Sequence, residues 1–361
     1  MRPRSRPWTV LALALLVAAT VTSSALPLAA GGHPASAAAP AGRDGGGPPR
    51  PEARDVVLAV HGGAGTALRR EDTDARTEKA YRDGLADALR AGQRVLRRGG
   101  DSVAAVEAAV RVLEDNPLFN AGKGAVFNED AGHELDASVM RGSDQAAGAV
   151  AGVRHVRNPV SAARLVMERT RHVLLAGEAA DAFAARAGLV PVTQDYFWTQ
   201  KRWDELMKAK QAGPAAAARD ESVTGTVGAV AVDARRGLAA ATSTGGTTGK
   251  MAGRVGDSPL VGAGTYARNG VVAASATGQG EVFIRGAAAA TVSHLVEFGG
   301  RDVASAAYEV VVERLPKLGG KGGIIALDDH GTYAAPHSSE GMLHGYATKD
   351  GDIVTRIFPD E

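Results

Sequence analysis

The first half of the chain alternates short apolar runs with long amphipathic stretches. Residues 55–60 (DVVLAV) form a nearly continuous apolar run, typical of a buried strand, which ends at the glycine-rich stretch HGGAG, residues 61–65. Between residues 77 and 98, alanine and leucine recur with helical spacing, so this stretch predicts a helix. Asp101 is placed as the N-cap of a second amphipathic helix over SVAAVEAAVRVLED, residues 102–115.

The middle of the chain is less regular. Residues 117–142 have no helical period and many turn formers, so we expect a loop that leads into strands. GAVAGV, residues 148–153, predicts another short strand, and residues 158–188 predict a helical stretch. Residues 208–224 contain few large apolar side chains and predict an exposed, mobile segment.

The last third of the chain is dominated by strands. Residues 226–244 predict a hairpin with its turn near residues 234–237. Further strands are expected at 271–277, 322–329 and 331–336, and helices at about 281–298 and 302–315. Helices are grouped before and after blocks of strands, and hairpins join the strands. The pattern therefore favours helices layered over antiparallel or mixed sheets, and not a doubly wound parallel sheet.

Residues 1–37 predict a secretory signal peptide. Three arginines precede TVLALALLVAATV, which is too short to cross a bilayer comfortably, and small residues with A-x-A-like exits follow it. A short membrane anchor is the alternative. The Pro/Gly-rich residues 38–54 predict a linker, so we expect one folded domain over residues 55–361 and a protein that is secreted.

Composition narrows the classes of protein. The chain is 45% hydrophobic and 22% charged, as in a globular protein, and its 46 glycines favour many tight turns over a helical bundle. The formal net charge of +1 would become −2 on loss of the three signal-peptide arginines. We therefore expect no nucleic-acid partner and no stable membrane anchor. The chain has no cysteine, which excludes a cysteine nucleophile and a thiolate metal site.

Several familiar binding and catalytic motifs are incomplete or absent. HGGAG lacks the G-x-G-x-x-G pattern, so a tight turn with close packing is favoured over a nucleotide site. GGTTGKM, residues 245–251, lacks two of the residues that a phosphate loop requires. Neither H-E-x-x-H nor G-x-S-x-G occurs. Glu134 and Asp136 could serve as an acid–base pair, although such residues are more typical of strand edges and turns.

Three threonines next to glycines remain: Thr226, Thr244 and Thr277, each at the edge of an apolar strand. A threonine hydroxyl needs a base, and a free α-amine on the same residue can supply one, with a pKa of about 7.7–8.0. Thr226 would become N-terminal if its hydroxyl attacked the Gly225 carbonyl and water opened the resulting ester. Glycine suits that bond because it leaves the carbonyl accessible. The alternative is a threonine that merely begins a strand.

The stretch GTVGAVAVDARRGLAAATSTGGTTGKMAGRVGDSPLVGAGTYA, residues 225–267, closely resembles the plant-type asparaginases, also called isoaspartyl peptidases. The likeness extends to HGGAG, PLFNAGKGAVF, HELDASVM, ATGQGEVFIR and LGGKGGIIALD, and so spans residues 56 to about 345. The resemblance implies an α+β fold, the four-layer αββα sandwich of N-terminal-nucleophile hydrolases. It also implies self-cleavage into an α subunit, residues 55–225, and a β subunit, residues 226–361.

The resemblance assigns catalytic roles to five residues. Thr226 would cut the chain and then act as the nucleophile, with Thr244 hydrogen-bonded to it. Thr277 and the backbone N–H of Gly278 would form the oxyanion hole and contact the substrate. Asn120 would position the loop and water near the nucleophile.

The resemblance also implies binding residues. Arg254 and Asp257 would hold the α-carboxylate and α-ammonium of the substrate, with the Gly280 carbonyl on the same ammonium. No cofactor is expected for catalysis. A structural sodium ion would be held by the backbone carbonyls of Leu113, Glu114, Asn116, Phe119, Ala121 and Lys123.

The expected activity is hydrolysis of L-asparagine and of β-aspartyl dipeptides by an (αβ)₂ assembly. Gly249, Gln279 and PHSSEGM, residues 336–342, depart from the usual family pattern or occupy variable positions, so substrate preference stays open. A glycosylasparaginase is the alternative within the family, but Gly225 and TSTGG argue against it. A secreted binding protein is the alternative from another class, and it predicts an uncut chain.

Overall fold

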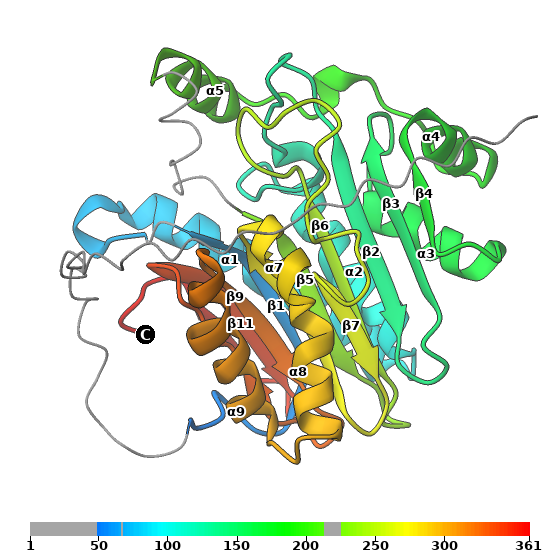
Figure 1. Ribbon diagram of the computed structural model, residues 1–361, viewed down its shortest axis with the longest axis vertical. Helices are drawn as coiled ribbons and strands as arrows, with labels where there is room; N and C mark the ends of the chain where they lie inside the picture. The colour runs from blue at the N-terminus through cyan, green and yellow to red at the C-terminus, as the bar shows by residue number, and fades with distance from the viewer. Residues whose placement is uncertain (1–48, 66–67, 213–224) are drawn as a thin grey trace, which may run out of the picture. The chain divides into compact units, whose positions relative to one another are not determined.

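The computed structural model describes residues 49–65, 68–212 and 225–361 (Figure 1). The predicted signal peptide, most of the predicted linker and residues 213–224 of the predicted exposed segment lie outside the described residues. Within the described ranges, no helix is long and apolar enough to cross a membrane.

Two β-sheets form the centre of the domain. The larger sheet has the strand order β12-β11-β1-β5-β6-β2-β3-β4, and the smaller has the order β10-β9-β8-β7. The larger sheet is mixed, because β3 and β4 run parallel, and every pair in the smaller sheet is antiparallel. The strands of the larger sheet are β1 (Val56–Gly65), β2 (Leu135–Arg141), β3 (Ala147–Val153), β4 (Leu174–Ala176), β5 (Val227–Val232), β6 (Leu238–Thr244), β11 (Gly341–Thr348) and β12 (Ile353–Arg356). Those of the smaller sheet are β7 (Thr265–Arg268), β8 (Val272–Gly278), β9 (Gly322–Leu327) and β10 (Tyr333–Ala334).

Helices cover the outer face of each sheet (Figure 1). Those that contact the larger sheet are α1 (Ala75–Arg97), α2 (Ser102–Asp115), α3 (Pro159–Arg169) and α4 (Gly177–Arg186). Those that contact the smaller sheet are α7 (Gly280–Gly286), α8 (Ala288–Glu297) and α9 (Val303–Tyr308). The inner faces of the two sheets pack together, since β1, β5 and β6 contact β8. The layers are therefore helix, sheet, sheet and helix, as the resemblance predicts.

Strand β5 carries apolar residues on both faces because both of its faces are buried. Alternate side chains of a strand point to opposite faces of the sheet. Ala229 and Ala231 pack in the core beneath α1 and α2, and Val230 and Val232 pack in the core between the sheets. A strand buried on both faces reads as a continuous apolar run, which is the pattern that predicted it.

The N-cap predicted at Asp101 is confirmed, whereas the helix expected from residue 77 begins at Ala75 behind a cap that was not predicted. The Asp101 carboxylate accepts from the backbone N–H of Ala104 at 2.8 Å, and Asp74 caps α1 in the same way at Thr77. Both carboxylates satisfy donors that have no partner in the first turn of a helix. The hairpin β5–β6 is also confirmed, with Val227 opposite Ser243.

Other predicted elements are wrong in detail. Residues 158–188 do not form one helix, because Gly177, with φ of +59°, separates α4 from the short strand β4, which pairs with β3. The helix expected at 281–298 is broken at Ala287, whose φ of +42° is left-handed. Residues 208–212, expected to be exposed and mobile, are mostly exposed, but they form the end of helix α5 (Gln200–Ala212). HGGAG is the end of β1, and the turn expected there does not form.

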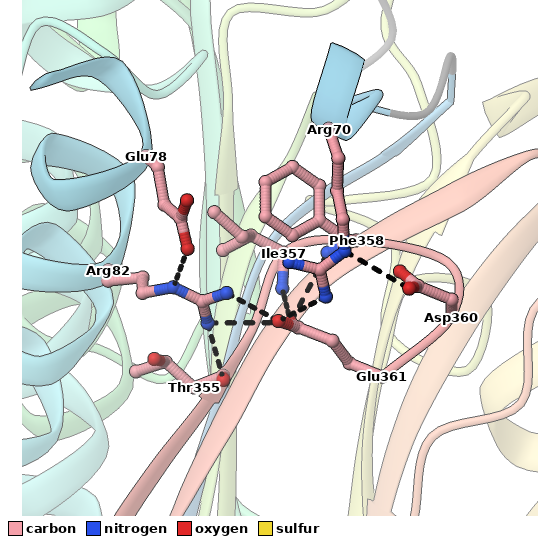
Figure 2. Close-up of polar contacts among 8 residues, drawn as sticks. All are labelled: Arg70, Glu78, Arg82, Thr355, Ile357, Phe358, Asp360 and Glu361. Carbon is pink, nitrogen blue, oxygen red and sulfur yellow. Dashed lines mark hydrogen bonds and ion pairs between the residues drawn. The ribbon is translucent and has the colours of Figure 1, made fainter. Parts of the chain in front are cut away.

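The segment after β12 is tied to the first helix by charge (Figure 2). The Glu361 carboxylate accepts from the guanidinium groups of Arg82 and Arg70 and from the backbone N–H groups of Ile357 and Phe358. These arginines belong to α1 and to the 3₁₀ turn η1 (Arg70–Asp72). The cluster thus joins residues before the Gly225–Thr226 bond to residues after it.

The charge of Glu361 predicts that the stability of the folded protein depends on pH. Burial raises the pKa of this carboxyl, but the hydrogen bonds from Arg82 and from the Ile357 and Phe358 N–H groups outweigh that effect and lower the pKa to about 2. The folded protein therefore stabilises the ionised form of this carboxyl relative to the unfolded chain.

We expect Glu361→Gln to lower the free energy of unfolding at pH 7 by about 1–2 kcal/mol, because charge-assisted hydrogen bonds become neutral ones. The loss should be full above pH 4.5, the ordinary value for Glu, and should vanish as the pH falls toward 2. Urea unfolding, followed by circular dichroism in a Thr226→Ala background that cannot cut itself, measures it. Asp360→Asn is the matched control, because Asp360 is exposed and, among the described residues, its side chain pairs only with Arg70. An equal cost at pH 2 and pH 7 would contradict this account.

Candidate active site

The Gly225–Thr226 peptide bond lies at the start of β5, where several polar groups converge on it. The Gly225 carbonyl oxygen accepts a hydrogen bond from Asn120 Nδ2 at 2.7 Å and one from Thr244 Oγ1 at 3.2 Å. The Thr226 hydroxyl lies 3.1 Å from Thr244 Oγ1. Thr226 is 6% exposed. The buried Thr226 hydroxyl and the partly buried Gly225 carbonyl are thus held together through Thr244.

The direction of these hydrogen bonds follows from counting hydrogens. A carbonyl can only accept, so the single hydroxyl hydrogen of Thr244 is donated to Gly225. The Gly246 N–H also donates to Thr244 Oγ1, at 2.9 Å. Thr226 must then be the donor in its contact with Thr244. The hydroxyl hydrogens therefore run from Thr226 through Thr244 to the Gly225 carbonyl.

Asn120 is itself fixed by its neighbours. Its Nδ2 also donates to the Gly246 carbonyl at 2.7 Å, and its Oδ1 accepts from the Val126 N–H at 3.0 Å. A Cβ on Gly245 would lie 2.6 Å from Asn120 Oδ1, so only glycine fits there. Gly245, the first glycine after Thr244 in TSTGG, therefore makes room for Asn120 beside Thr226.

The end of β1 contacts the start of β5 in its own sheet and the end of β8 in the smaller sheet. The carbonyl of Thr226 accepts from His61 Nδ1 at 2.9 Å, and the Ala64 N–H donates to Thr277 Oγ1 at 3.0 Å. Gly63 has φ of +124°, and a Cβ on it would lie 2.9 Å from the Gly225 Cα. The glycines of HGGAG therefore serve close approach, as expected, although within a strand. No sequence pattern predicted that His61 would lie beside Thr226.

The expected oxyanion-hole residues end β8 in the smaller sheet. Thr277 is fully buried, and the Ala64 N–H occupies an acceptor position of its hydroxyl, whose hydrogen can be donated to an oxyanion. Gly278 has φ of +147°, and a Cβ there would lie 2.5 Å from the Gly322 Cα. Both residues are held by close contacts, as a preorganised oxyanion hole requires.

The expected binding residues come together around Gly280, the first residue of α7. A Cβ on Gly280 would lie 2.9 Å from Asp257 Oδ1 and 3.0 Å from Arg254 Nη2. Asp257 is 4% exposed, and its Oδ2 has no hydrogen-bond partner among the described residues. Burial raises the pKa of its carboxyl to about 7, against its own backbone N–H and the Arg254 charge, which lower it. A buried carboxylate in this condition is suited to a cationic partner such as an ammonium group.

Glu281 is a member of this group that sequence reasoning missed. Its carboxylate accepts from Arg254 Nε at 2.9 Å and from Arg254 Nη2 at 3.0 Å, although its own side chain is 65% exposed. Burial raises the pKa of Glu281, but Arg254 outweighs burial and holds this pKa below its usual range. A substrate carboxylate must use the remaining N–H groups of Arg254 or displace Glu281. The position of Glu281 directly after Gly280, an expected binding residue, is the sequence feature that could have identified it.

Glu134 and Asp136 have structural partners. Glu134 accepts from Lys250 Nζ through its carbonyl, at 2.8 Å, and from the Gly253 N–H through its carboxylate, at 3.0 Å. Asp136 accepts from the Gly152 N–H at 2.8 Å, and burial raises the pKa of its carboxyl. The Glu134 contacts hold the loop that carries Arg254, and the Asp136 contact joins β2 to β3, which agrees with the structural alternative and not with an acid–base pair. In the same loop Gly249 has φ of +69°, a conformation that glycine and asparagine tolerate.

A cavity of about 160 Å³ opens on the Gly225 side of the Gly225–Thr226 bond. Its lining includes Gly225, Asn120, Tyr81 and, from α5, Lys201, but not Arg254 or Asp257. The sequence did not predict α5, so this wall of the site was missed.

The expected sodium ligands surround the turn between α2 and η2 (Gly122–Gly124). A Cβ on Gly122 would lie 2.3 Å from the Glu114 carbonyl oxygen, and one on Gly124 would lie 2.1 Å from that of Phe119. Glycine therefore keeps the space beside these oxygens open, and carbonyl oxygens suit a hard cation. The residues fit such an ion, and the ligand set stays a prediction.

Comparison with known proteins places the chain in a family. A family model described as asparaginase matches residues 54–357. An isoaspartyl peptidase of Salmonella typhimurium is 53% identical over 308 residues, 83% of this chain and 97% of that protein. One of Escherichia coli is 50% identical, over 85% of this chain and 97% of its own. A mouse isoaspartyl peptidase/L-asparaginase is 43% identical, over 84% of this chain and 90% of its own. The chain belongs to the asparaginase family of N-terminal-nucleophile hydrolases, and its αββα sandwich is the fold of that family.

Proposed function

We propose that this protein is a self-cleaving hydrolase of β-aspartyl dipeptides and L-asparagine that acts through an ester on Thr226. The observation that carries the proposal is the contact of the Thr226 hydroxyl with Thr244, which in turn donates to the Gly225 carbonyl. The names of the relatives support the same substrates, since each is an isoaspartyl peptidase or an isoaspartyl peptidase/L-asparaginase.

Self-cleavage uses the geometry of the uncut chain. Thr226 Oγ1 attacks the Gly225 carbonyl carbon, while Asn120 Nδ2 and the Thr244 hydroxyl stabilise the charge on the carbonyl oxygen. The C–N bond breaks, the nitrogen of Thr226 takes the proton of the hydroxyl, and an ester joins Gly225 to Thr226. Water then opens the ester and leaves a Gly225 carboxylate and a Thr226 with a free amine and hydroxyl.

Hydrolysis of substrate repeats the chemistry with a new base. The free amine of Thr226 accepts the hydroxyl proton, and Oγ1 attacks the side-chain amide carbon of the substrate. Thr277 and the Gly278 N–H stabilise the oxyanion. The Thr226 ammonium then gives its proton to the nitrogen of the leaving group, which departs as ammonia or an amino acid. Water hydrolyses the acyl ester to aspartate. Because Gly225 has gone, the Thr244 hydroxyl can then donate to the Thr226 oxygen.

Substrate selection rests on the groups around Gly280. Arg254 binds the α-carboxylate, and Asp257 with the Gly280 carbonyl binds the α-ammonium. These charged groups favour an aspartyl residue whose α-carboxylate and α-ammonium are both free. An aspartyl residue within a peptide chain has neither charge.

We further propose that the chain is exported, with residues 1–37 as its signal peptide and residues 38–54 as a linker. The α subunit, residues 55–225, and the β subunit, residues 226–361, stay together after cleavage and assemble as (αβ)₂. The charged cluster at Glu361 supports their association because it joins the two segments.

Self-cleavage is tested by intact mass. We expect the purified protein to give two chains separated at Gly225–Thr226, and Thr226→Ala to give a single chain, because the attacking oxygen is gone. Asn120→Ala should slow cleavage by about a hundredfold, as loss of one oxyanion donor does elsewhere.

Arg254→Ala is the matched control, because Arg254 has no contact with Gly225 or Thr226 and should leave cleavage intact. An uncut wild type, as expected of a binding protein, would refute the proposal. Cleavage that persists in Thr226→Ala would do so as well.

Asp257 gives the binding step a pH dependence. The carboxylate that attracts the ammonium group is dominant only above its pKa of about 7. We therefore expect kcat/KM for a β-aspartyl dipeptide to rise through pH 7, and to rise again near pH 8 as the Thr226 amine loses its proton. In Asp257→Asn the step at pH 7 should disappear, and kcat/KM should fall by about a hundredfold.

Steady-state rates from pH 5.5 to 9.5 measure both effects. Asp257→Asn should still cut itself completely, since Asp257 does not touch the scissile bond. A step at pH 7 that survives in this variant would assign it to another group and remove Asp257 from the ammonium site.

A further inference from the structure

A row of polar side chains runs between the two sheets, starting at the nucleophile. His61 Nδ1 lies 2.9 Å from the carbonyl oxygen of Thr226, and His61 Nε2 lies 2.9 Å from Ser275 Oγ. Ser275 Oγ in turn lies 2.7 Å from Thr242 Oγ1. All four residues are buried, and they come from β1, the start of β5, β8 and β6. The row therefore ties the nucleophile to both sheets.

The same row continues to the substrate-binding loop. The Thr265 hydroxyl lies beside Thr242, and Ser138 Oγ lies 2.8 Å from Thr265 Oγ1 and 2.6 Å from the Ser258 carbonyl oxygen. Ser258 directly follows Asp257 in the chain. One set of buried hydrogen bonds thus connects the Thr226 carbonyl with the residue next to the proposed ammonium site.

Hydrogen-bond chemistry sets the tautomer of His61. The Thr226 carbonyl can only accept, so His61 Nδ1 must carry the hydrogen. Burial lowers the pKa of His61 to about 3, although its hydrogen bond to Thr226 raises it, so the ring is neutral at pH 7. Nε2 is then an acceptor, and Ser275 must be its donor. Ser275 Oγ has one hydrogen, which Nε2 requires, so Thr242 Oγ1, which accepts from Thr265, must donate its own hydrogen to Ser275 at 2.7 Å. The remaining acceptor near Ser275, the Ala241 carbonyl, is farther away than Nε2, at 3.2 Å.

The backbone leaves space for this bond. A Cβ on Gly228, two residues after the nucleophile, would lie 2.0 Å from Ser275 Oγ and 2.4 Å from His61 Nε2. Any side chain at this position of TVG would separate the imidazole from the hydroxyl. Gly228 is therefore required by the contact between His61 and Ser275.

We propose that His61 and Ser275 are a pair of positioning residues for Thr226. Ser275 holds the imidazole in the form with hydrogen on Nδ1, and this hydrogen holds the Thr226 carbonyl, which fixes the start of β5 and the direction of the Thr226 hydroxyl. In the other tautomer the lone pair of Nδ1 would face the carbonyl lone pairs and push the nucleophile away. The inference rests on the proposed function, in which Thr226 is the nucleophile.

A double-mutant cycle tests the pair. Ser275→Ala should lower both the self-cleavage rate and kcat by about tenfold and change KM by less than about twofold, because the tautomer is no longer held. His61→Asn should stay within about threefold of wild type, since Asn Nδ2 can take the place of Nδ1 and has no tautomer. In the His61→Asn background, Ser275→Ala should then have almost no further effect.

Ser293→Ala is the matched control, because Ser293 is a fully buried serine in α8 with no hydrogen-bond partner among the residues that the structure describes. It should leave both rates unchanged. An equal cost of Ser275→Ala in the two backgrounds would overturn the proposal, because the serine would then act without the imidazole. A cost that falls on KM alone would overturn it too.

The tautomer itself is measured by long-range ¹H–¹⁵N NMR of histidine-labelled protein at pH 7, with His61 assigned from its absence in His61→Asn. A neutral ring with hydrogen on Nδ1 is expected. Hydrogen on Nε2, or a charged ring, refutes the inference even if Ser275→Ala fails to fold. The measurement works equally in Thr226→Ala, which keeps the carbonyl. An inactive, uncut wild type would refute the proposed function, whereas an active wild type with the wrong tautomer would refute this inference alone.

Discussion

The double hydrogen bond to the Gly225 carbonyl oxygen is the constraint on which the site depends. Asn120 and Thr244 both donate to this oxygen, and Thr226 donates to Thr244. Amide planarity normally protects a peptide bond, and both donors act where negative charge would develop if it were attacked. Much of the surrounding sequence serves this contact, since Gly63 and Gly245 leave the space that Gly225 and Asn120 occupy.

The layered fold explains how distant residues reach this bond. Hairpin pairing puts Thr226 and Thr244 at the same end of the larger sheet, and β1 lies next to β5 in that sheet. Thr277 ends a strand of the other sheet and reaches the site because the sheets pack face to face. Buried polar groups between two sheets are costly unless they are paired, which is why His61, Ser275 and the neighbouring hydroxyls form a continuous row.

Local patterns predicted the elements whose partners are close in sequence. The cap at Asp101 and the β5–β6 hairpin follow from residues that are close together in the chain. Predictions failed where backbone conformation is decided at a distance. The break at Gly177 permits β4 to pair with β3, and the strands β7, β11 and β12 are short or rich in polar and glycine residues, so they depend on neighbours for their conformation.

The sequence by itself singled out the bond that we propose is cut, because Gly-Thr before an apolar strand would carry its own nucleophile and, once cut, its own base. It also determined the residue types able to hold an amino acid head. Only the tertiary structure decided that Arg254 pairs with Glu281, that Asp257 is buried without a hydrogen-bond partner for Oδ2 in the described parts of the chain, and that His61 holds the Thr226 carbonyl. The reason is physical: reactivity belongs to residue types, whereas the pKa of a carboxyl and the tautomer of an imidazole are set by groups far apart in the chain that packing brings into contact.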